Sequence, residues 1–312
     1  MTLPADIIVS AQGLSRSFGD IAAVRNVDLA IGKGEIFGLV GPDGAGKTTT
    51  MRMLAGVLSP DAGQIFLDGI DVVRAPEHAK PHISYMPQRF GLYEDLTVLE
   101  NIFFYAELFG IPASVRRTRS AELLSAAAMA PFSKRLAGRL SGGMKQKLGL
   151  VCALIHAPDV LLLDEPTTGV DPVSRREFWE ILYRLRESGV TIVFSTAYMD
   201  EAERCSRLAL MNAGEIRHCD TPDRLKRAMP GALLSVTAVD VRGAFDALKG
   251  VPGVLGKLMM GDRVNVRVDD ARRREPELRE ALARQAIAAE VGSIEPSIED
   301  VFVALLGKGQ AT

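Results

Sequence analysis

The chain contains 312 residues, of which 47% are hydrophobic, and its 37 basic and 39 acidic side chains give a net charge of −2. This length suffices for one large and one small domain, the near-neutral charge gives no reason to expect a nucleic-acid partner, and no apolar stretch approaches the roughly 20 residues that cross a bilayer. We expect no secretory signal, and the widely spaced Cys152, Cys205 and Cys219 predict neither a zinc cluster nor a disulfide framework, as in a reducing cytoplasm.

A short apolar segment at 36–40 predicts a buried strand, and a glycine-rich loop follows it. The loop reads Gly41, Pro42, Asp43, Gly44, Ala45, Gly46, Lys47, Thr48, which fits G-x-x-x-x-G-K-[ST] at every fixed position, and Thr49 follows it. Glycines let the backbone N–H groups turn toward a phosphate, and a helix expected at 49–58 directs its positive end to the same anion. Lys47 then reaches the β- and γ-phosphates, and the Thr48 hydroxyl holds Mg²⁺. The alternative is a strand-to-helix turn without a ligand.

The segment at 97–140 is rich in Ala, Leu, Glu and Arg at helical spacing, which predicts a helical subdomain. It ends at Leu140, where a second glycine motif begins. Ser141 is suited to cap the helix that follows, and Gly142 and Gly143 leave backbone N–H groups free to meet an anion.

A second buried strand is predicted at 160–163, because an uninterrupted apolar run is typical of a parallel strand covered on both faces. It ends in Asp164 and Glu165. At the carboxyl end of such a strand, Asp164 can support Mg²⁺ and Glu165 can polarise a water for in-line attack on a γ-phosphate. Either acid alone would more readily be a helix cap or a surface charge, but after a phosphate loop the pair predicts a Mg²⁺-nucleotide site.

In this order the motifs resemble those of the ATP-binding-cassette (ABC) ATPases, whose LSGGQ signature is matched at 140–144 with Met144 at a variable position. The resemblance implies an α/β P-loop ATPase domain at 1–228 that contains the helical subdomain and binds ATP and Mg²⁺. It also implies a head-to-tail dimer, in which Ser141, Gly142 and Gly143 of one cassette cover the nucleotide of another. The second cassette is either a copy of this chain or a different protein.

The same resemblance assigns three further residues. Phe18 stands where the family stacks an aromatic ring on adenine, although a lone phenylalanine also suits a core. Gln88 stands where the family senses Mg²⁺ and the γ-phosphate, and completes a catalytic set with Glu165 and Lys47 and a metal set with Thr48 and Asp164. Asp171 stands in the loop that crosses the dimer interface. The apolar residues at 90–93 either pack between subdomains or grip a membrane-subunit helix.

One position departs from the family pattern, because Ala197 stands where these ATPases carry a histidine that bonds the γ-phosphate. Loss of one donor to transition-state charge typically costs on the order of 10² to 10³ in rate. None of the 4 histidines is adjacent in sequence, and Thr196 and Tyr198 are the neighbouring hydroxyls. We expect this chain's own site to bind ATP and turn over slowly, which favours a heterodimer over a homodimer with two slow sites.

A domain boundary is expected near 228–231, and 229–312 predicts a small ferredoxin-like α+β unit. We expect strands at 233–237, 254–260, 263–268 and 290–295 and helices at 243–249 and 276–289. A last helix at 297–306 carries a capping box formed by Ser297 and Asp300.

This tail and the segment at 198–203 are similar to the drug-resistance-type ATP-binding subunits that serve type 2 ABC exporters. The resemblance implies an ATP hydrolase, peripheral at the cytoplasmic face of the cell membrane, that couples ATP hydrolysis to export through a separate integral-membrane permease. The alternative is a regulatory cassette that supports hydrolysis at a partner's site with little turnover of its own.

Overall fold

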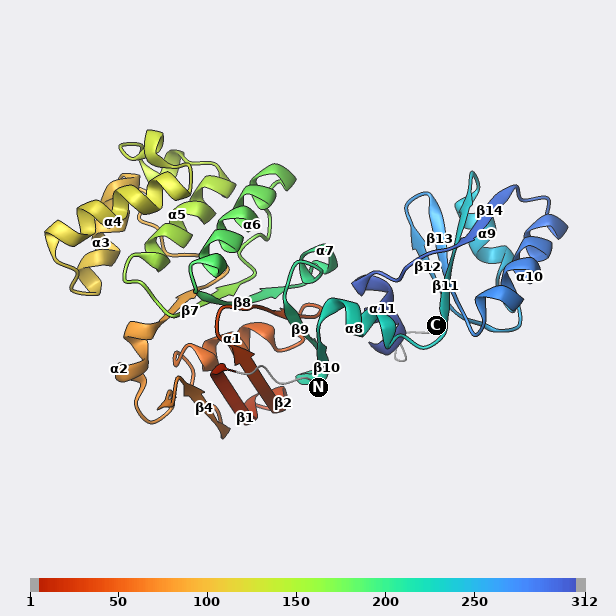
Figure 1. The fold of residues 1–312 in the computed structure, drawn as a ribbon, viewed down its shortest axis with the longest axis horizontal. Helices are drawn as coiled ribbons and strands as arrows, with labels where there is room; N and C mark the ends of the chain where they lie inside the picture. Colours follow the sequence, from red (N-terminus) through yellow and green to blue (C-terminus); the bar gives the residue numbers. More distant parts are fainter. Residues whose placement is uncertain (1–5, 307–312) are drawn as a thin grey trace. The chain divides into compact units, whose positions relative to one another are not determined.

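The structure, a computed structural model, describes residues 6–306, which divide into two compact units (Figure 1). The first unit ends at Asp220 and the second begins at Thr221. This division precedes the boundary expected near 228, because helix α8 (Pro222–Arg227) packs against α11 (Ile298–Leu306) of the second unit. The expected domains also include 1–5 and 307–312, which lie outside the described residues.

The larger sheet of the first unit has the strand order β10-β9-β3-β8-β7-β6 and is parallel except for the antiparallel pair of β9 and β10. Its strands are β3 (Ile36–Val40), β6 (Ile83–Met86), β7 (Val160–Asp164), β8 (Thr191–Thr196), β9 (Arg207–Asn212) and β10 (Glu215–Asp220). Both apolar strands expected from the sequence are confirmed. Val40 pairs with Thr196, and Asp164 pairs with Ser195, so the carboxyl ends of β3, β7 and β8 meet at one edge of the sheet.

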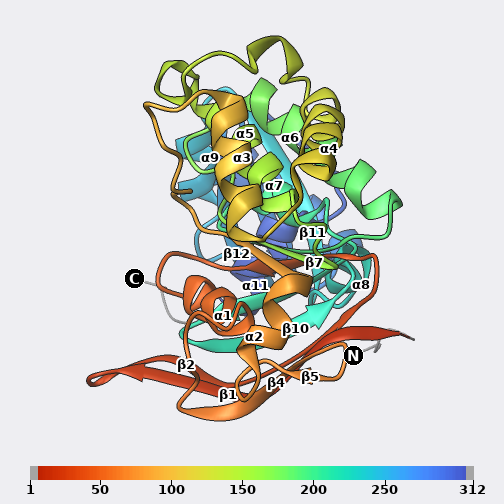
Figure 2. The same ribbon diagram turned by 90° about the vertical axis from the view of Figure 1, so that its left-hand side faces the viewer.

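The smaller sheet is antiparallel, with the order β2-β1-β4-β5. Its strands are β1 (Ile7–Phe18), β2 (Ile21–Gly32), β4 (Ala62–Leu67) and β5 (Ile70–Asp71). Figure 2 shows this sheet on one side of α1, and α3, α4, α5 and α6 on the other side.

The helices of the first unit are α1 (Lys47–Leu54), α2 (Pro76–Ala79), α3 (Val98–Leu108), α4 (Ala113–Ala126), α5 (Gly142–Leu154), α6 (Pro172–Glu187) and α7 (Met199–Ala202), with short 3₁₀ turns at Lys80–His82, Ala130–Phe132 and Ala137–Arg139. Helix α1 is shorter than the expected 49–58, because Gly56 adopts a φ of 68° just beyond its end. Helices α3 and α4 occupy the segment expected to form the helical subdomain. Ser141 caps α5 as expected, since its Oγ accepts from the Met144 N–H at 3.3 Å.

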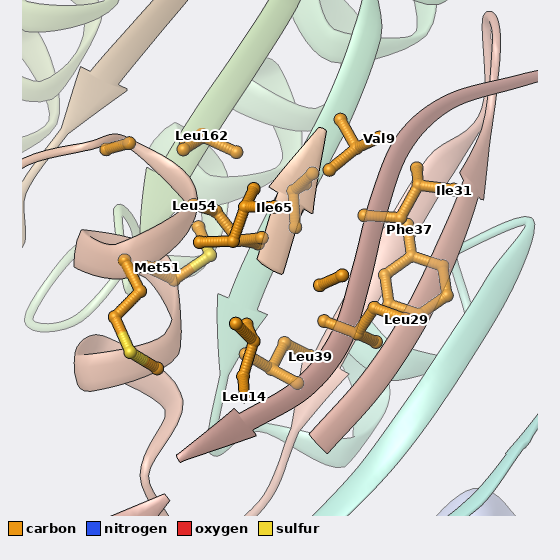
Figure 3. Packing of buried hydrophobic residues seen from close by; sticks show 14 of the residues in the cluster. Val9, Leu14, Leu29, Ile31, Phe37, Leu39, Met51, Leu54, Ile65 and Leu162 are labelled. Carbon is orange, nitrogen blue, oxygen red and sulfur yellow. The ribbon is translucent and has the colours of Figure 1, made fainter. Parts of the chain in front are cut away.

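The main core of the first unit fixes both ends of the glycine-rich loop (Figure 3). Phe37 and Leu39 of β3 and Met51 and Leu54 of α1 belong to one buried cluster with side chains of the smaller sheet. Burial of such side chains contributes roughly 1.5 to 3 kcal/mol each, so the strand and helix on either side of the loop are held firmly in place.

The second unit has the predicted order of strand, helix, strand, strand, helix and strand: β11 (Ala232–Ala238), α9 (Val241–Ala247), β12 (Val254–Met260), β13 (Arg263–Val268), α10 (Ala271–Arg284) and β14 (Ala289–Ser293). The strands form one antiparallel sheet in the order β12-β13-β11-β14. Helix α10 begins before the expected position 276, because Asp270 caps it by accepting from the Arg273 N–H at 3.1 Å. The capping box of Ser297 and Asp300 is confirmed, with bonds of 2.9 and 3.2 Å to the two backbone N–H groups. Across residues 6–306, no helix combines the length and apolar character required to span a membrane.

We predict that Gly63→Ala destabilises the first unit more than Gly69→Ala does. Both glycines have positive φ, but a Cβ at Gly63 would lie 2.6 Å from the carbonyl oxygens of Gln12 and Gly13, whereas Gly69 faces open space. The extra loss should be about 1 to 3 kcal/mol of unfolding free energy, as for other overpacked sites. Urea unfolding followed by the fluorescence of Trp179 measures it, and equal losses in the two variants would contradict the clash.

Candidate functional site

A cavity of about 870 Å³ opens beside the glycine-rich loop. Its lining residues are Phe18, Ile21, Ala22, Ala23, Arg25, Asp43, Gly44, Ala45, Gly46, Lys47, Thr48, Thr49, Gln88, Glu165, Thr168, Ala197, Tyr198 and Ala213. The volume lies within the range of roughly 300 to 1,000 Å³ that is typical of small-molecule sites. The cavity therefore brings together the glycine-rich loop, Phe18, Gln88, Glu165 and Ala197, which lie far apart in the sequence.

The glycines of the loop are required by the packing of the fold as well as by any ligand. Gly46 has a φ of 104°, and a Cβ there would lie 2.4 Å from the Ala23 carbonyl oxygen. A Cβ at Gly41 would lie 2.2 Å from the Met211 carbonyl oxygen. Neither approach tolerates a side chain, so the loop is pressed against β9 at Gly41 and against β2 at Gly46.

Lys47 is 3% exposed and is held by acceptors on three sides. Its Nζ donates to the carbonyl oxygens of Gly41 at 2.8 Å and Pro42 at 3.0 Å. It also forms an ion pair of 3.0 Å with Glu165 Oε1. A buried ammonium group is stable only with such partners, and incoming phosphate oxygens can take the place of Glu165.

Asp164 lies beneath the cavity wall and accepts three hydrogen bonds. Its Oδ1 accepts from Ser195 Oγ at 2.7 Å and Thr48 Oγ1 at 3.1 Å, and its Oδ2 accepts from the Tyr85 hydroxyl at 3.1 Å. Burial and the nearby Asp164 carboxylate raise the pKa of Tyr85 to about 12, so the phenol stays protonated and continues to donate. Ser195 and Tyr85 were not predicted from the sequence, because only the pairing of β6, β7 and β8 places them beside Asp164.

Glu165 occupies a strained backbone conformation at the cavity wall, with a φ of 47°. Its N–H donates to Ser195 Oγ at 3.0 Å, and its Oε2 accepts from Gln88 Nε2 at 3.2 Å. A left-handed conformation at a residue other than glycine is uncommon and is concentrated at functional sites. The strand end thus directs Asp164 beneath the loop and Glu165 into the cavity.

The oxygens beside Thr48 suit a magnesium ion that arrives with a nucleotide. At the start of α1, Thr48 Oγ1 lies 3.1 Å from Asp164 Oδ1. The Gln88 side chain is hydrogen-bonded to the adjacent Glu165. Within residues 6–306, no group of three or more His, Cys, Asp and Glu side chains is arranged to hold a metal ion. Mg²⁺ commonly takes one or two protein oxygens and completes its shell with phosphates and water, so this donor set fits it.

At position 197 the structure distinguishes the two neighbouring hydroxyls. Thr196 Oγ1 donates to Glu201 Oε2 at 2.7 Å and accepts from the Tyr198 N–H at 2.9 Å, so it is fully engaged away from the cavity. Tyr198 lines the cavity beside Ala197, and its ring lies 4.4 Å from the Arg175 guanidinium carbon. No histidine lines this cavity.

Phe18 is 48% exposed at the cavity, so the alternative that it belongs to the core is wrong. The Arg16 guanidinium carbon lies 5.2 Å from the ring centroid. The aromatic residues at 90–93 contact α3, with Phe90 5.0 Å from Tyr105 between ring centroids and Tyr93 4.6 Å from Phe104. These contacts place both rings against the helical subdomain, and Tyr93 keeps an exposed edge.

The second glycine motif and Asp171 do not line the cavity. Ser141 and Gly142 are exposed at the start of α5, and a Cβ at Gly143 would lie 2.4 Å from Ser174 Cβ of α6. Asp171 caps α6 through the N–H groups of Val173 at 3.1 Å and Ser174 at 2.9 Å. The hydrogen bonds from Ser174 and from the Val173 N–H lower the pKa of the Asp171 carboxyl below its usual value.

Comparison with known proteins adds independent findings. A family model described as "ABC transporter" matches residues 24–168. The chain is 42% identical over 314 residues to the probable multidrug ABC transporter ATP-binding protein YbhF of Escherichia coli, covering 97% of this chain but 52% of that protein, so it spans about half of this relative. It is 34% identical over 305 residues to the daunorubicin resistance ATP-binding protein DrrA2 of Streptomyces coeruleorubidus, covering 96% of this chain and 95% of that protein.

Solved structures of ATP-binding cassettes also match this chain. The structure of an ATP-binding subunit of an ABC transporter is 28% identical, with a TM-score of 0.64, and the match covers 70% of this chain and 92% of the other. A dimeric ATP-binding cassette in a post-hydrolysis state, bound to ADP and Pi, is 27% identical, with a TM-score of 0.62, covering 68% of this chain and 98% of the other.

We predict that Ser195→Ala lowers the unfolding free energy by about 1 to 3 kcal/mol, because it leaves buried Asp164 Oδ1 short of one donor. Ser84→Ala removes the same atom from a buried serine of β6 and serves as the matched control. Chemical denaturation of both variants measures the difference. If Ser195→Ala is no more destabilising than Ser84→Ala, the bond to Asp164 contributes little.

Proposed function

The chain belongs to the ABC transporter family, and we propose that it is the ATP-binding subunit of a multicomponent exporter that couples ATP binding and hydrolysis to substrate export through separate membrane permease subunits. The observation that carries the proposal is the meeting of Lys47, Thr48, Asp164 and Glu165 at one cavity. The relatives named for multidrug transport and daunorubicin resistance support a drug-like substrate class.

The contacts at the cavity support a sequence of events on ATP binding. Phosphate oxygens bind the loop N–H groups and draw the Lys47 amine away from Glu165, so that the Glu165 carboxylate is free to accept a proton from an attacking water. Gln88, 3.2 Å from Glu165 Oε2, orients that water. When bound, Mg²⁺ neutralises charge on the β- and γ-phosphates, and Thr48, Asp164 and Gln88 are the residues that would hold it.

A second cassette completes the site. Ser141, Gly142 and Gly143 do not line this chain's own cavity, yet they present N–H groups at the start of α5. These groups are suited to bind an anion supplied by another subunit. In a head-to-tail dimer, each cassette supplies these N–H groups to the nucleotide bound by the other cassette. Asp171 then lies in the loop at the interface.

Ala197 weakens this chain's own hydrolytic site. It lines the cavity where the family's switch histidine would stand, Thr196 is engaged elsewhere, and Tyr198 is the neighbouring hydroxyl at the cavity. A heterodimer is therefore favoured, in which this chain's Ser141, Gly142 and Gly143 serve a faster site on the partner. The second candidate function rests on the same observation: a regulatory cassette that binds ATP with little turnover of its own.

The remaining features support a subunit that is peripheral at the cytoplasmic face of the membrane. The exposed edge of Tyr93, beside the Gln88 loop, is suited to contact a permease helix. The second unit, with its strand order β12-β13-β11-β14 and two helices, is best described as a ferredoxin-like accessory domain.

We predict that Ala197→His raises ATP turnover of the purified chain on the order of 10²-fold, because an imidazole restores a donor to developing charge on the γ-phosphate. Phosphate release under saturating Mg²⁺-ATP measures it. Glu165→Gln in the same background should abolish the gain, since the water then lacks its base. If the purified chain dimerises with ATP and Ala197→His still gives no gain, residue 197 does not limit turnover.

A second prediction separates the heterodimer from the homodimer. With its partner cassette present, Gly142→Asp should lower turnover at least tenfold, because a carboxylate would face the partner's nucleotide phosphates across the interface. Within residues 6–306, a Cβ at Gly142 would meet no neighbouring atom within 4 Å, so the chain's own fold is spared. Glu165→Gln should have little effect on the same assembly. A homodimer would instead lose turnover with either change.

A further inference from the structure

A buried carboxylate outside the cavity joins several segments of its wall. Glu201 of α7 is 0% exposed. Its Oε1 accepts from Thr167 Oγ1 at 2.7 Å and from Trp179 Nε1 at 3.3 Å, and its Oε2 accepts from Thr196 Oγ1 at 2.7 Å. The Arg175 Nε lies 3.7 Å from Oε1. This site was not predicted from the sequence.

The donors belong to segments that serve the nucleotide. Thr196 precedes Ala197, and its carbonyl oxygen accepts from the N–H of Gly41, the first residue of the phosphate loop, at 3.2 Å. Thr167 lies two residues beyond Glu165. Arg175 lies in the first turns of α6, and its N–H donates to the carbonyl oxygen of Asp171 at 2.9 Å. One carboxylate therefore contacts the three segments that contain Ala197, Glu165 and Asp171.

Burying a carboxylate among polar partners has a free-energy cost, which suggests that the positions it fixes serve a purpose. The desolvation cost of a buried carboxylate must be offset by hydrogen bonds and a nearby cation. An apolar side chain of similar volume often stabilises a core equally well. A hydrogen-bonded polar network, in contrast, fixes the relative positions of its members. Thr167, Trp179 and Thr196 form such bonds to Glu201, whereas the buried Arg175 Nε contributes only its charge. The polar contacts of Glu201 thus favour a role in alignment over a role in stability.

We propose that Glu201 is a positioning residue for ATP hydrolysis, which aligns the segment around Ala197 with Glu165 and with the start of α6. The inference rests on the proposed function. When ATP engages the phosphate loop, displacement of Thr196 is transmitted through Glu201 to Trp179 and Arg175 of α6, and so to Asp171 at the expected dimer interface.

The chain carries its own probe of this connection. Trp179 is its single tryptophan, and the indole N–H donates directly to Glu201. Its fluorescence therefore reports a change in the Glu201 contacts without any label. Binding of ATP is measured separately, by equilibrium dialysis of the full chain with radiolabelled ATP and Mg²⁺.

We expect ATP to change the Trp179 emission of the unmodified chain and of Thr196→Ser, which keeps the hydroxyl. Thr196→Val keeps the shape of the side chain but removes the donor to Glu201, so the change should disappear although ATP still binds. ATP that binds without any change in emission, or a change that survives in Thr196→Val, would overturn this inference alone. Failure of ATP to bind the unmodified chain would overturn the proposed function as well.

Turnover gives a second measurement. Glu201→Gln keeps the volume of the side chain, and misplacement of reacting groups by about 1 Å can cost roughly 100-fold in rate. We expect the gain produced by Ala197→His to fall at least tenfold in the Glu201→Gln background, with ATP affinity retained. If Glu201→Gln lowers the melting temperature but leaves that gain intact, Glu201 is structural and the inference is wrong. If Ala197→His gives no gain in either background although the chain dimerises with ATP, the slow-site proposal is refuted and the Trp179 emission decides the role of Glu201.

Discussion

The ion pair between Lys47 and Glu165 is the contact on which the site depends, because it joins the two motifs that the fold brings together. Lys47 begins α1, and Glu165 follows the end of β7. Removing one partner of a buried pair typically costs about 3 to 5 kcal/mol, because the remaining charge is left uncompensated. An arriving phosphate can replace Glu165 because it supplies another anion to the same Lys47 ammonium group. Under the proposed function, charge balance at Lys47 would thus couple nucleotide binding to release of the Glu165 carboxylate.

This contact requires close control of the backbone on both sides. The phosphate loop is pressed against β9 so tightly that a Cβ at Gly41 would lie 2.2 Å from a carbonyl oxygen. Glu165 holds a left-handed conformation that costs on the order of 1 to 3 kcal/mol in a residue with a side chain. The buried β7, with Asp164 bonded to neighbouring strands, provides the packing that sustains this strain.

The residues that could be predicted from the sequence are those whose chemistry is local. The phosphate loop, the paired acids and the succession of strands and helices along the second unit follow from patterns within short segments. Ser195 and Tyr85 could not be found in this way, because their partner depends on which strands are neighbours and in what register. The partners of Glu201 depend on how α6 and the segment after β7 pack around α7. The shorter α1 and the earlier α10 have local causes, at Gly56 and Asp270, that a periodicity of apolar residues does not detect.

The contacts at the end of β8 explain how the backbone of Ala197 is held in place although its side chain is small. Consecutive residues of a strand point to opposite faces of the sheet. Accordingly, Ser195 donates to Asp164 on one face, whereas Thr196 donates to Glu201 on the other. Two buried carboxylates thus hold the last two residues of the strand from opposite faces, and the Tyr198 N–H closes the turn onto Thr196. The backbone of Ala197 is therefore placed by contacts that its own side chain does not make, so a change at this position alters the group presented to the cavity and leaves its location in place.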